Sequence, residues 1–163
     1  MLRINYKKLL LKKNKIPITC LTAYSKPLAN ILDGKVDLIL IGDSLGTTLY
    51  GMKNTRGVTL DMMKNHGKAV VKNAKSSMTI VDMPYNTYRN KKEALKNAHE
   101  LISFTKADFL KIETDKKNIE IVKYLSDNKI KVVSHIGVTP QKFSDFRKIK
   151  SVGKNASDAK KLL

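Results

Sequence analysis

The sequence predicts an α/β fold of the (β/α)8 barrel (TIM-barrel) type. Strand-like apolar runs alternate with helix-like ones along the chain, as in a parallel sheet wrapped by helices. Three of these runs lead into Asp43, Asp82 and Glu113, and catalytic groups at the carboxyl ends of successive strands are typical of barrel enzymes. About five βα units fit into 163 residues, against about 250 residues for a typical barrel. We therefore expect residues 1–163 to form one incomplete barrel domain, truncated after about five βα units.

The first elements are expected within residues 9–41. Leu9-Leu10-Leu11, flanked by lysines, predicts a short amphipathic helix that covers one end of the sheet. Residues 16–22 are rich in β-formers and predict the first strand. A short helix follows over residues 27–32, with Pro27 in its first turn. The apolar stripe expected for this helix is Leu28, Ile31 and Leu32. Residues 36–41 are almost continuously apolar, which indicates a second strand covered on both faces.

The middle of the chain predicts a loop, a helix and the third strand. A long loop is expected after Gly46, through Gly51 and Gly57. Thr59 is a good N-cap for the next helix, and Asp61 is favourable in its first turn. The apolar stripe expected for this helix is Met63, Gly67, Val70 and Val71. Residues 78–81 predict the third strand.

The last third of the chain continues the alternation. Asn90 and Glu93 have the spacing of a helix N-terminus. Residues 109–112 predict the fourth strand, and Val132-Val133 is the centre of the fifth. The remaining segments predict a helix around residues 119–125, a loop over residues 135–153, and the beginning of a further helix over residues 156–163.

Three carboxylates are expected to converge at one edge of the sheet. Asp43, Asp82 and Glu113 follow neighbouring strands by a similar offset, and carboxylates gathered in one cleft repel each other unless a hard cation is bound. Mg²⁺ fits best because it takes oxygen ligands and keeps waters that a substrate displaces. Lys111 lies two residues before Glu113 and so shares its face of the strand. Each acid taken alone is as well explained as a helix cap or strand end.

Neighbouring residues extend this candidate site. The segment from Gly42 to Gly46 offers flexible backbone N–H groups that suit an anionic substrate group. Tyr24 and His135 stand at the tips of the first and fifth strands, where they are candidates to line the same mouth. His66 and His99 fall on predicted helices and are interpreted as surface or interface residues.

Composition limits the alternatives. The net charge of +18 raises the possibility of a nucleic-acid binder, but the cations are nearly all lysines scattered over predicted helices, with few aromatics to stack on bases. A solvated lysine-rich surface is the better interpretation. Cys20 cannot form an internal disulfide and is interpreted as a small buried hydrophobic residue. Neither a membrane-spanning run nor a signal-peptide start at Met1-Leu2-Arg3 is visible, so a cytoplasmic location is expected.

Ordered motifs over residues 16–154 resemble the ketopantoate hydroxymethyltransferase family, the folate-dependent enzymes of pantothenate biosynthesis. Motifs in order over most of a chain are more specific than any one of them. They are Thr22-Ala23-Tyr24, Ile41-Gly42-Asp43-Ser44-Leu45-Gly46, Val58-Thr59-Leu60-Asp61-Met62, Asp82-Met83-Pro84, Glu93-Ala94-Leu95-Lys96-Asn97-Ala98, Lys111-Ile112-Glu113 and His135-Ile136-Gly137-Val138-Thr139-Pro140-Gln141.

The resemblance implies a Mg²⁺-dependent transferase. It makes Asp43, Asp82 and Glu113 the metal ligands, directly or through water, and Asp43, Ser44, Asp82 and Lys111 the residues that hold the 2-oxo acid. The reaction is transfer of a hydroxymethyl group from 5,10-methylenetetrahydrofolate to 3-methyl-2-oxobutanoate, which gives 2-dehydropantoate. The substrate's C–H proton is removed, and the resulting enolate attacks the one-carbon unit. The family also implies a large homo-oligomer.

The sequence departs from the family at several places. The family's general base is a Glu on a later strand, beyond Leu163, so residues 1–163 alone are expected to be inactive and prone to aggregation. Ser25 stands where the family has Asp, Thr114-Asp115 where it has a glycine pair, and residues 147–154 diverge from its glycine-rich loop. A carbon–carbon lyase or mutase of the phosphoenolpyruvate-mutase and isocitrate-lyase type is the alternative enzyme, which would need a reactive Cys in a later loop.

Overall fold

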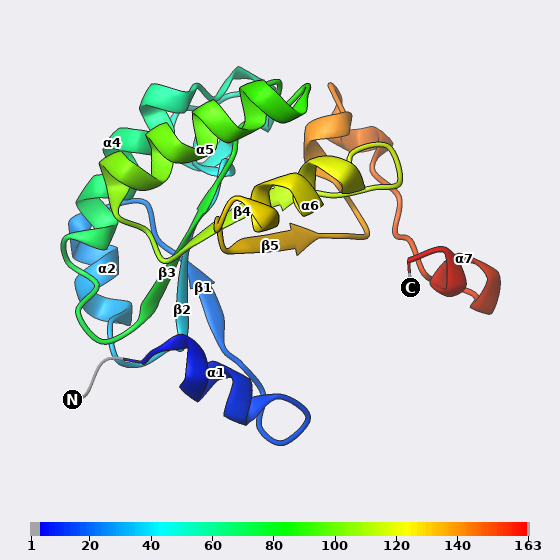
Figure 1. Cartoon of the computed structure of the whole chain (residues 1–163). Helices are drawn as coiled ribbons and strands as arrows, with labels where there is room; N and C mark the ends of the chain where they lie inside the picture. The colour runs from blue at the N-terminus through cyan, green and yellow to red at the C-terminus, as the bar shows by residue number, and fades with distance from the viewer. Residues whose placement is uncertain (1–3, 163) are drawn as a thin grey trace.

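The protein, described over residues 4–162 by a computed structural model, is built on a parallel sheet with strand order β1-β2-β3-β4-β5. Helices α2, α4, α5 and α6 wrap its outer face (Figure 1). This arrangement confirms the expected α/β architecture of barrel type. The strands are β1 (Cys20–Thr22), β2 (Leu38–Ile41), β3 (Met78–Asp82), β4 (Phe109–Glu113) and β5 (Val132–His135); the helices are α2 (Lys26–Leu32), α4 (Leu60–Val71), α5 (Lys91–Thr105) and α6 (Ile119–Asp127).

The first helix, α1 (Tyr6–Lys12), closes the amino-terminal end of the sheet. Asn5 caps it by accepting a hydrogen bond from the Lys8 N–H at 3.0 Å. Leu9 is buried in a small apolar cluster with Met78, Ile80 and Phe109 on the concave face of the sheet. The expectation that an amphipathic helix covers one end of the sheet is therefore confirmed.

The first two strands are shorter than the sequence predicted. Ladder pairing begins only at Cys20 and Leu38. One residue earlier, the Thr19 N–H donates to the Asp37 side chain at 2.9 Å, so a carboxylate takes the place of a ladder carbonyl. The prediction that residues 16–19 and 36–37 belong to the strands was therefore wrong. These residues lead into β1 and β2.

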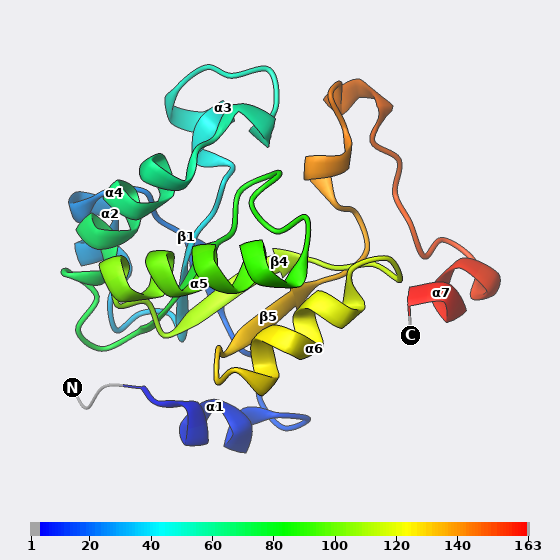
Figure 2. The same cartoon turned by 45° about the horizontal axis from the view of Figure 1, so that its top comes forward.

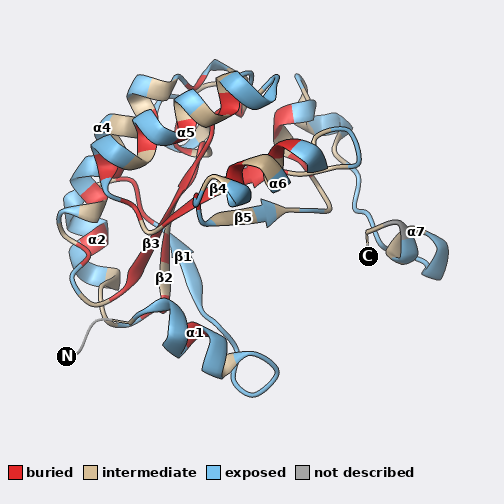
Figure 3. Cartoon of the chain, in the orientation of Figure 1, coloured by how far each residue is buried: buried red, intermediate tan, exposed pale blue. Residues whose placement is uncertain are grey.

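The third and fourth strands are longer than predicted, because they include Asp82 and Glu113 as their last residues. All five residues of β3 are buried, whereas all three of β1 are exposed (Figure 3). Cys20 is exposed, which contradicts its interpretation as a buried hydrophobic residue. The cause is its place on the edge strand, where the described part of the chain supplies pairing only on the β2 side.

Helix boundaries follow the local signals closely. Thr59 accepts from the Met62 N–H at 3.2 Å and starts α4, and Asn90 accepts from the Glu93 N–H at 3.0 Å and starts α5. The apolar stripe predicted for α2 was wrong at two of its three positions, since only Leu32 packs against the core. Leu28 and Ile31 are exposed and Ala29 is buried instead, because the smallest side chain faces the sheet.

The predicted loop after Gly46 contains two short elements. They are α3 (Leu45–Leu49) and the 3-10 turn η1 (Thr55–Gly57), so the loop interpretation was partly wrong. The loop predicted after β5 contains the 3-10 turns η2 (Pro140–Lys142) and η3 (Phe146–Lys148). The last helix, α7, spans Ala156–Leu162, and the predicted end of this helix at Leu163 lies outside the described residues.

All five strands run the same way, so their carboxyl ends share one edge. Figure 2 shows α3 and the segments that follow β3 and β5 gathered at that edge, opposite α1. This edge holds the candidate site. None of the helices within residues 4–162 is both long enough and apolar enough to cross a bilayer.

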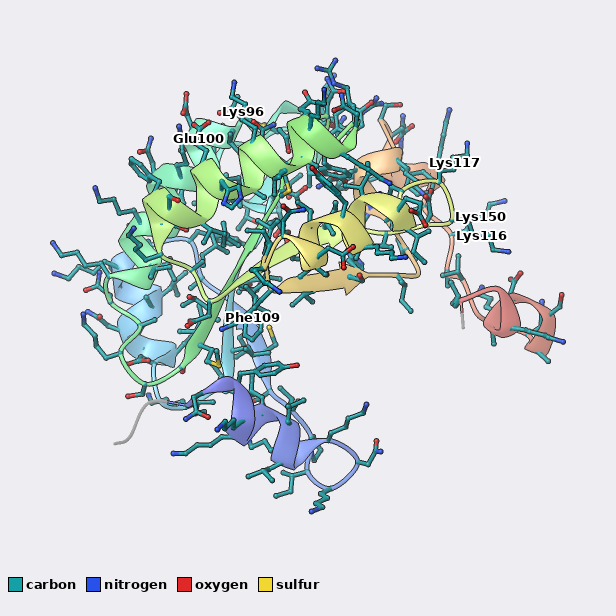
Figure 4. All side chains as sticks on the ribbon, in the orientation of Figure 1. Lys96, Glu100, Phe109, Lys116, Lys117 and Lys150 are labelled. Carbon is teal, nitrogen blue, oxygen red and sulfur yellow. The ribbon has the colours of Figure 1, made fainter. Side chains whose placement is uncertain are left out.

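The lysines contribute a dispersed charge. Lys96, Lys116, Lys117 and Lys150 are exposed and project outward, Lys96 from α5 and the other three together on one side of the molecule (Figure 4). Several other lysines are paired with acids, among them Lys64 with Glu100 and Lys12 with Asp37. These exposed and acid-paired lysines agree with the solvated lysine-rich surface that the sequence indicated.

Candidate active site

The three predicted carboxylates converge at the carboxyl edge of the sheet. Asp82 and Glu113 end β3 and β4, and Asp43 lies two residues beyond β2. The expectation of equal offsets was wrong, since the ladder pairs Asp82 with Lys111 and Glu113 with His135. The strands are staggered, and the stagger brings carboxylates with different offsets to one mouth. All three are buried, with 3% to 7% of their surface exposed.

Asp82 stands at the centre of the group. Its Oδ2 accepts the Asp43 backbone N–H at 3.2 Å, and its Oδ1 accepts Lys111 Nζ at 2.8 Å. Lys111 is on the same face of β4 as Glu113, as alternation along a strand predicted. The ammonium therefore partly balances the buried acidic charge.

Gly42 allows this close approach. A Cβ at position 42 would lie 2.9 Å from Ser44 Oγ and 3.6 Å from Asp82 Oδ2. A side chain there would clash with Ser44 Oγ and force the Ser44 side chain to move, whereas its contact with Asp82 would be ordinary. The glycine thus serves the packing of the site.

The segment from Gly42 to Gly46 is not a flexible donor loop, so that prediction was wrong. The Leu45 N–H donates to the Gly42 carbonyl at 3.1 Å, and the Gly46 N–H donates to the Asp43 carbonyl at 3.0 Å. These bonds begin α3. The amides stabilise the turn that presents Asp43 and Ser44, and are not held open for an anion.

Tyr24 reaches the site through Ser44. The Tyr24 hydroxyl and Ser44 Oγ are 2.8 Å apart, and the Tyr24 carbonyl lies 2.6 Å from His66 Nδ1. His66 Nε2 in turn lies 2.9 Å from the Tyr50 hydroxyl. His66 therefore braces the end of β1 and is more than the surface residue that the sequence indicated.

His135 faces Glu113 across β4 and β5. Its Nδ1 is buried, lies 4.0 Å from Glu113 Oε1, and has no hydrogen-bond partner among residues 4–162. Burial first, and then the Lys111 charge, lower the pKa of His135 and favour the neutral ring. The placement confirms that His135 lines the mouth.

Gln141 is a site residue to which the sequence analysis gave no role, although it ends the motif His135–Gln141. Its side-chain amide donates to Asp43 Oδ2 at 2.7 Å, and its backbone N–H donates to both oxygens of Glu113 at 3.1 and 3.2 Å. The available signal was its position six residues after His135, in a segment that returns to the same edge. A glutamine without charge in a loop gives no pattern that separates it from a surface residue.

Burial governs the proton affinity of the acids. It raises the pKa of Asp43 to about 6, with the neighbouring Asp82 carboxylate adding to the effect. It also raises the pKa of Glu113 to about 7, against the opposing hydrogen bond from the Gln141 N–H. The pKa of Asp82 is raised by burial as well, although Lys111 opposes this. A bound cation would reverse these shifts by stabilising the ionised carboxylates.

A pH prediction follows for Asp43 in the metal-free protein. Its folded pKa lies above the unfolded one, so its stabilising contribution is complete below about pH 4 and is lost as the pH rises through about 6. The full loss corresponds to about 3 kcal/mol. Asp43→Asn keeps an acceptor for Gln141 and removes the charge. We expect this variant to gain thermal stability over wild type at pH 7.5 in EDTA and not at pH 4.

Thermal midpoints at both pH values, with and without Mg²⁺, test this prediction. Mg²⁺ at pH 7.5 should stabilise the wild type more than Asp43→Asn, because only the wild type has the charged ligand. Equal midpoints for the two proteins across the whole pH range would contradict the assigned titration of Asp43.

The donor set suits a hard cation, although the group is not preassembled. All three acids offer oxygen, and burial raises the pKa of each carboxyl, an effect that a bound cation would oppose. Within residues 4–162, no three His, Cys, Asp or Glu side chains are close enough to enclose one ion. A cation at this edge would therefore need water to complete its coordination.

A small hollow gives access beside Glu113. It measures about 210 Å³ and lies between the segments that follow β3, β4 and β5. Glu113 and Gln141 form one wall, and Tyr85, Tyr88 and Asn118 form others. A small molecule can therefore approach Glu113 from this side.

Comparison with known proteins gives a consistent family. A family model described as ketopantoate hydroxymethyltransferase matches residues 3–163. The 3-methyl-2-oxobutanoate hydroxymethyltransferase of Pelagibacter ubique (strain HTCC1062) is 52% identical over 152 residues, covering 93% of this chain and 58% of that protein. The Rhizobium etli enzyme of the same name is 43% identical over 147 residues, covering 90% and 54%. The chain thus spans little more than half the length of these curated relatives.

Solved structures share the fold. One of oxaloacetate acetylhydrolase has a TM-score of 0.59 at 14% identity, over 78% of this chain and 50% of that one. One of 2,3-dimethylmalate lyase, a member of the PEP mutase/isocitrate lyase superfamily, has a TM-score of 0.59 at 14% identity, over 82% and 51%. At this identity the likeness concerns the fold alone.

Proposed function

This chain belongs to the ketopantoate hydroxymethyltransferase family, and from that premise we propose that it takes part in transfer of a hydroxymethyl group from 5,10-methylenetetrahydrofolate to 3-methyl-2-oxobutanoate. The product is 2-dehydropantoate. One observation carries the proposal: three buried carboxylates and a lysine from β2, β3 and β4 meet at one edge of the sheet.

We propose that Mg²⁺ is held by Asp43, Asp82 and Glu113, directly or through water. The support is their burial, their oxygen donors and their raised pKa values. When bound, the ion would polarise the keto group of the 2-oxo acid and acidify the neighbouring C–H.

The protein groups around the acids would orient the substrate. Lys111 Nζ, already 2.8 Å from Asp82, is placed to pair with the substrate carboxylate. Ser44, held by the Tyr24 hydroxyl, offers a hydroxyl next to Asp43. Together these residues would fix the 2-oxo acid with its reacting carbon facing the mouth of the sheet.

The proton acceptor is not assigned within residues 1–163. His135 is neutral and close to Glu113, which makes it the first residue to replace if this chain alone exchanges the substrate proton. The homo-oligomeric state and the cytoplasmic location remain predictions from the sequence.

A carbon–carbon lyase or mutase is the second candidate from the sequence, and enzymes of this class share the fold of the chain. The single cysteine, Cys20, is on β1 and not in a loop at the carboxyl edge. This position does not match the reactive loop cysteine expected of that class.

The two candidates differ in substrate. The protein as its gene encodes it is incubated with Mg²⁺, 3-methyl-2-oxobutanoate and 5,10-methylenetetrahydrofolate, and in parallel with 2,3-dimethylmalate. Mass spectrometry should detect 2-dehydropantoate in the first mixture and no cleavage in the second. Cleavage of the dimethylmalate without formation of 2-dehydropantoate would replace the transferase proposal by the lyase.

A further inference from the structure

Gln141 lies at the junction of the three segments that follow β3, β4 and β5. It belongs to η2, six residues after β5 ends, and only 3% of its surface is exposed. A neutral, fully buried amide beside three acids is an unusual choice unless its donors are needed, because burying unpaired polar groups is costly.

The Gln141 side chain uses both ends of its amide. Nε2 donates to Asp43 Oδ2 at 2.7 Å and to the Met83 carbonyl at 2.9 Å. Oε1 accepts from the Tyr88 hydroxyl. The two N–H donors and the carbonyl are therefore all satisfied within the protein.

The partners of Gln141 determine which way its amide points. Rotating the amide by half a turn would place Oε1 against the Asp43 carboxylate and the Met83 carbonyl, which are both acceptors. Tyr88 bonds the opposite end of the amide, where its hydroxyl donates to Oε1 and holds the side chain in place. The donor end is thus locked toward Asp43.

The backbone of Gln141 binds the second acid. Its N–H donates to Oε1 and Oε2 of Glu113, while the side chain holds Asp43, 98 residues away in sequence. One residue therefore sets the relative orientation of the two carboxylates. Because the amide is uncharged, it restrains both acids and leaves their negative charge in place. A lysine at this position would instead neutralise part of that charge. The acids keep the negative charge that a cation requires.

We propose that Gln141 is a positioning residue for metal binding, which holds the Asp43 and Glu113 carboxylates in register and is itself supported by the hydrogen bond from Tyr88. This inference rests on the proposed function, because it assumes that the carboxylates bind a divalent cation. It assigns to Gln141 and Tyr88 a role outside the ligand set. Residues that orient metal ligands typically change metal affinity by 10- to 100-fold when removed.

The test is Mn²⁺ binding without substrate, measured by calorimetry on the protein as its gene encodes it. Gln141→Leu keeps most of the side-chain volume and removes both ends of the amide. We expect it to weaken Mn²⁺ binding by about 10-fold or more. Tyr88→Phe should weaken binding by a smaller factor, and the double variant should match Gln141→Leu, because Tyr88 acts through the glutamine.

Tyr85→Phe is the matched control. Its hydroxyl, on the same segment, accepts from Arg56 and not from Gln141, so its loss should leave Mn²⁺ affinity unchanged. A role of Gln141 in stability alone would lower the thermal midpoint and leave the affinity of the folded protein, measured at low temperature, as in wild type.

The outcomes separate the inference from its premise. Equal Mn²⁺ affinity in wild type and folded Gln141→Leu would overturn the positioning role and leave the proposed function standing. If Gln141→Leu does not fold, Tyr88→Phe decides: affinity equal to that of Tyr85→Phe overturns the inference, and weaker affinity supports it. Absence of Mn²⁺ binding by the wild type would remove the proposed function and the inference together.

Discussion

Replacing Asp82 with asparagine is expected to lower Mg²⁺-dependent turnover on the order of 10³-fold, which corresponds to about 4 kcal/mol of transition-state stabilisation. Asp82 is the carboxylate that both Asp43 and Lys111 contact, at 3.2 and 2.8 Å. Asparagine keeps the shape and an acceptor oxygen, so the backbone bond from Asp43 can persist. The missing element is the charge that would hold the ion.

Asp108→Asn is the control for this prediction. Asp108 stands at the amino-terminal end of β4, where its Oδ2 accepts from the Thr79 N–H and hydroxyl at 2.9 and 3.0 Å. It is at the far end of the same strand pair, so its replacement should affect stability and leave turnover of the folded enzyme intact. Steady-state kinetics at saturating Mg²⁺ measures both variants. Similar turnover in wild type and Asp82→Asn would sink the assignment of Asp82.

Replacing Lys111 with methionine is expected to raise the KM for 3-methyl-2-oxobutanoate by about 10- to 100-fold, since a hydrogen bond between charged groups contributes about 1.5–3 kcal/mol. The KM for methylenetetrahydrofolate should change little. Methionine retains an apolar stem of similar length, so the packing of β4 on β3 is preserved. Removing the ammonium also leaves Asp82 without its charged partner at 2.8 Å.

That last effect makes the Lys111 prediction sharp. Loss of a cation beside Asp82 should keep or increase Mn²⁺ affinity, even as affinity for the 2-oxo acid falls. Calorimetry with each ligand separately gives the two numbers. Equal weakening for the 2-oxo acid and the folate, or a loss of Mn²⁺ binding, would mean that Lys111 supports the site as a whole and has no particular role toward the substrate carboxylate.

Much of this site was predictable from the sequence because its signals are local. A strand that runs into an acid, such as Ile41 into Gly42 and Asp43, places that acid at the carboxyl edge whatever the exact end of the strand. The alternation of β4 put Lys111 and Glu113 on one face, and the structure confirms it. Helix starts at Thr59 and Asn90 followed from side chains that bond their own backbone.

What the sequence could not give depends on contacts between distant segments. Gln141 reaches Asp43 across 98 residues, and no periodicity marks such a contact. Cys20 lies in an apolar run that is typical of a core strand, but it is exposed. The burial of a strand depends on its neighbours in the sheet, and these are not marked in the sequence. The late start of the β1–β2 ladder at Cys20 and Leu38 likewise follows from the Asp37 side chain, which accepts a hydrogen bond from the Thr19 N–H.

The central claim is that the carboxyl ends of β2, β3 and β4 form a Mg²⁺-dependent site that activates a 2-oxo acid. Deuterium exchange at C3 of 3-methyl-2-oxobutanoate, followed by NMR in D₂O without folate, tests it most directly in the protein as its gene encodes it. The account predicts exchange that requires Mg²⁺, stops with EDTA, and falls at least 100-fold in Asp82→Asn. Exchange at the wild-type rate in EDTA, or in Asp82→Asn, would contradict it.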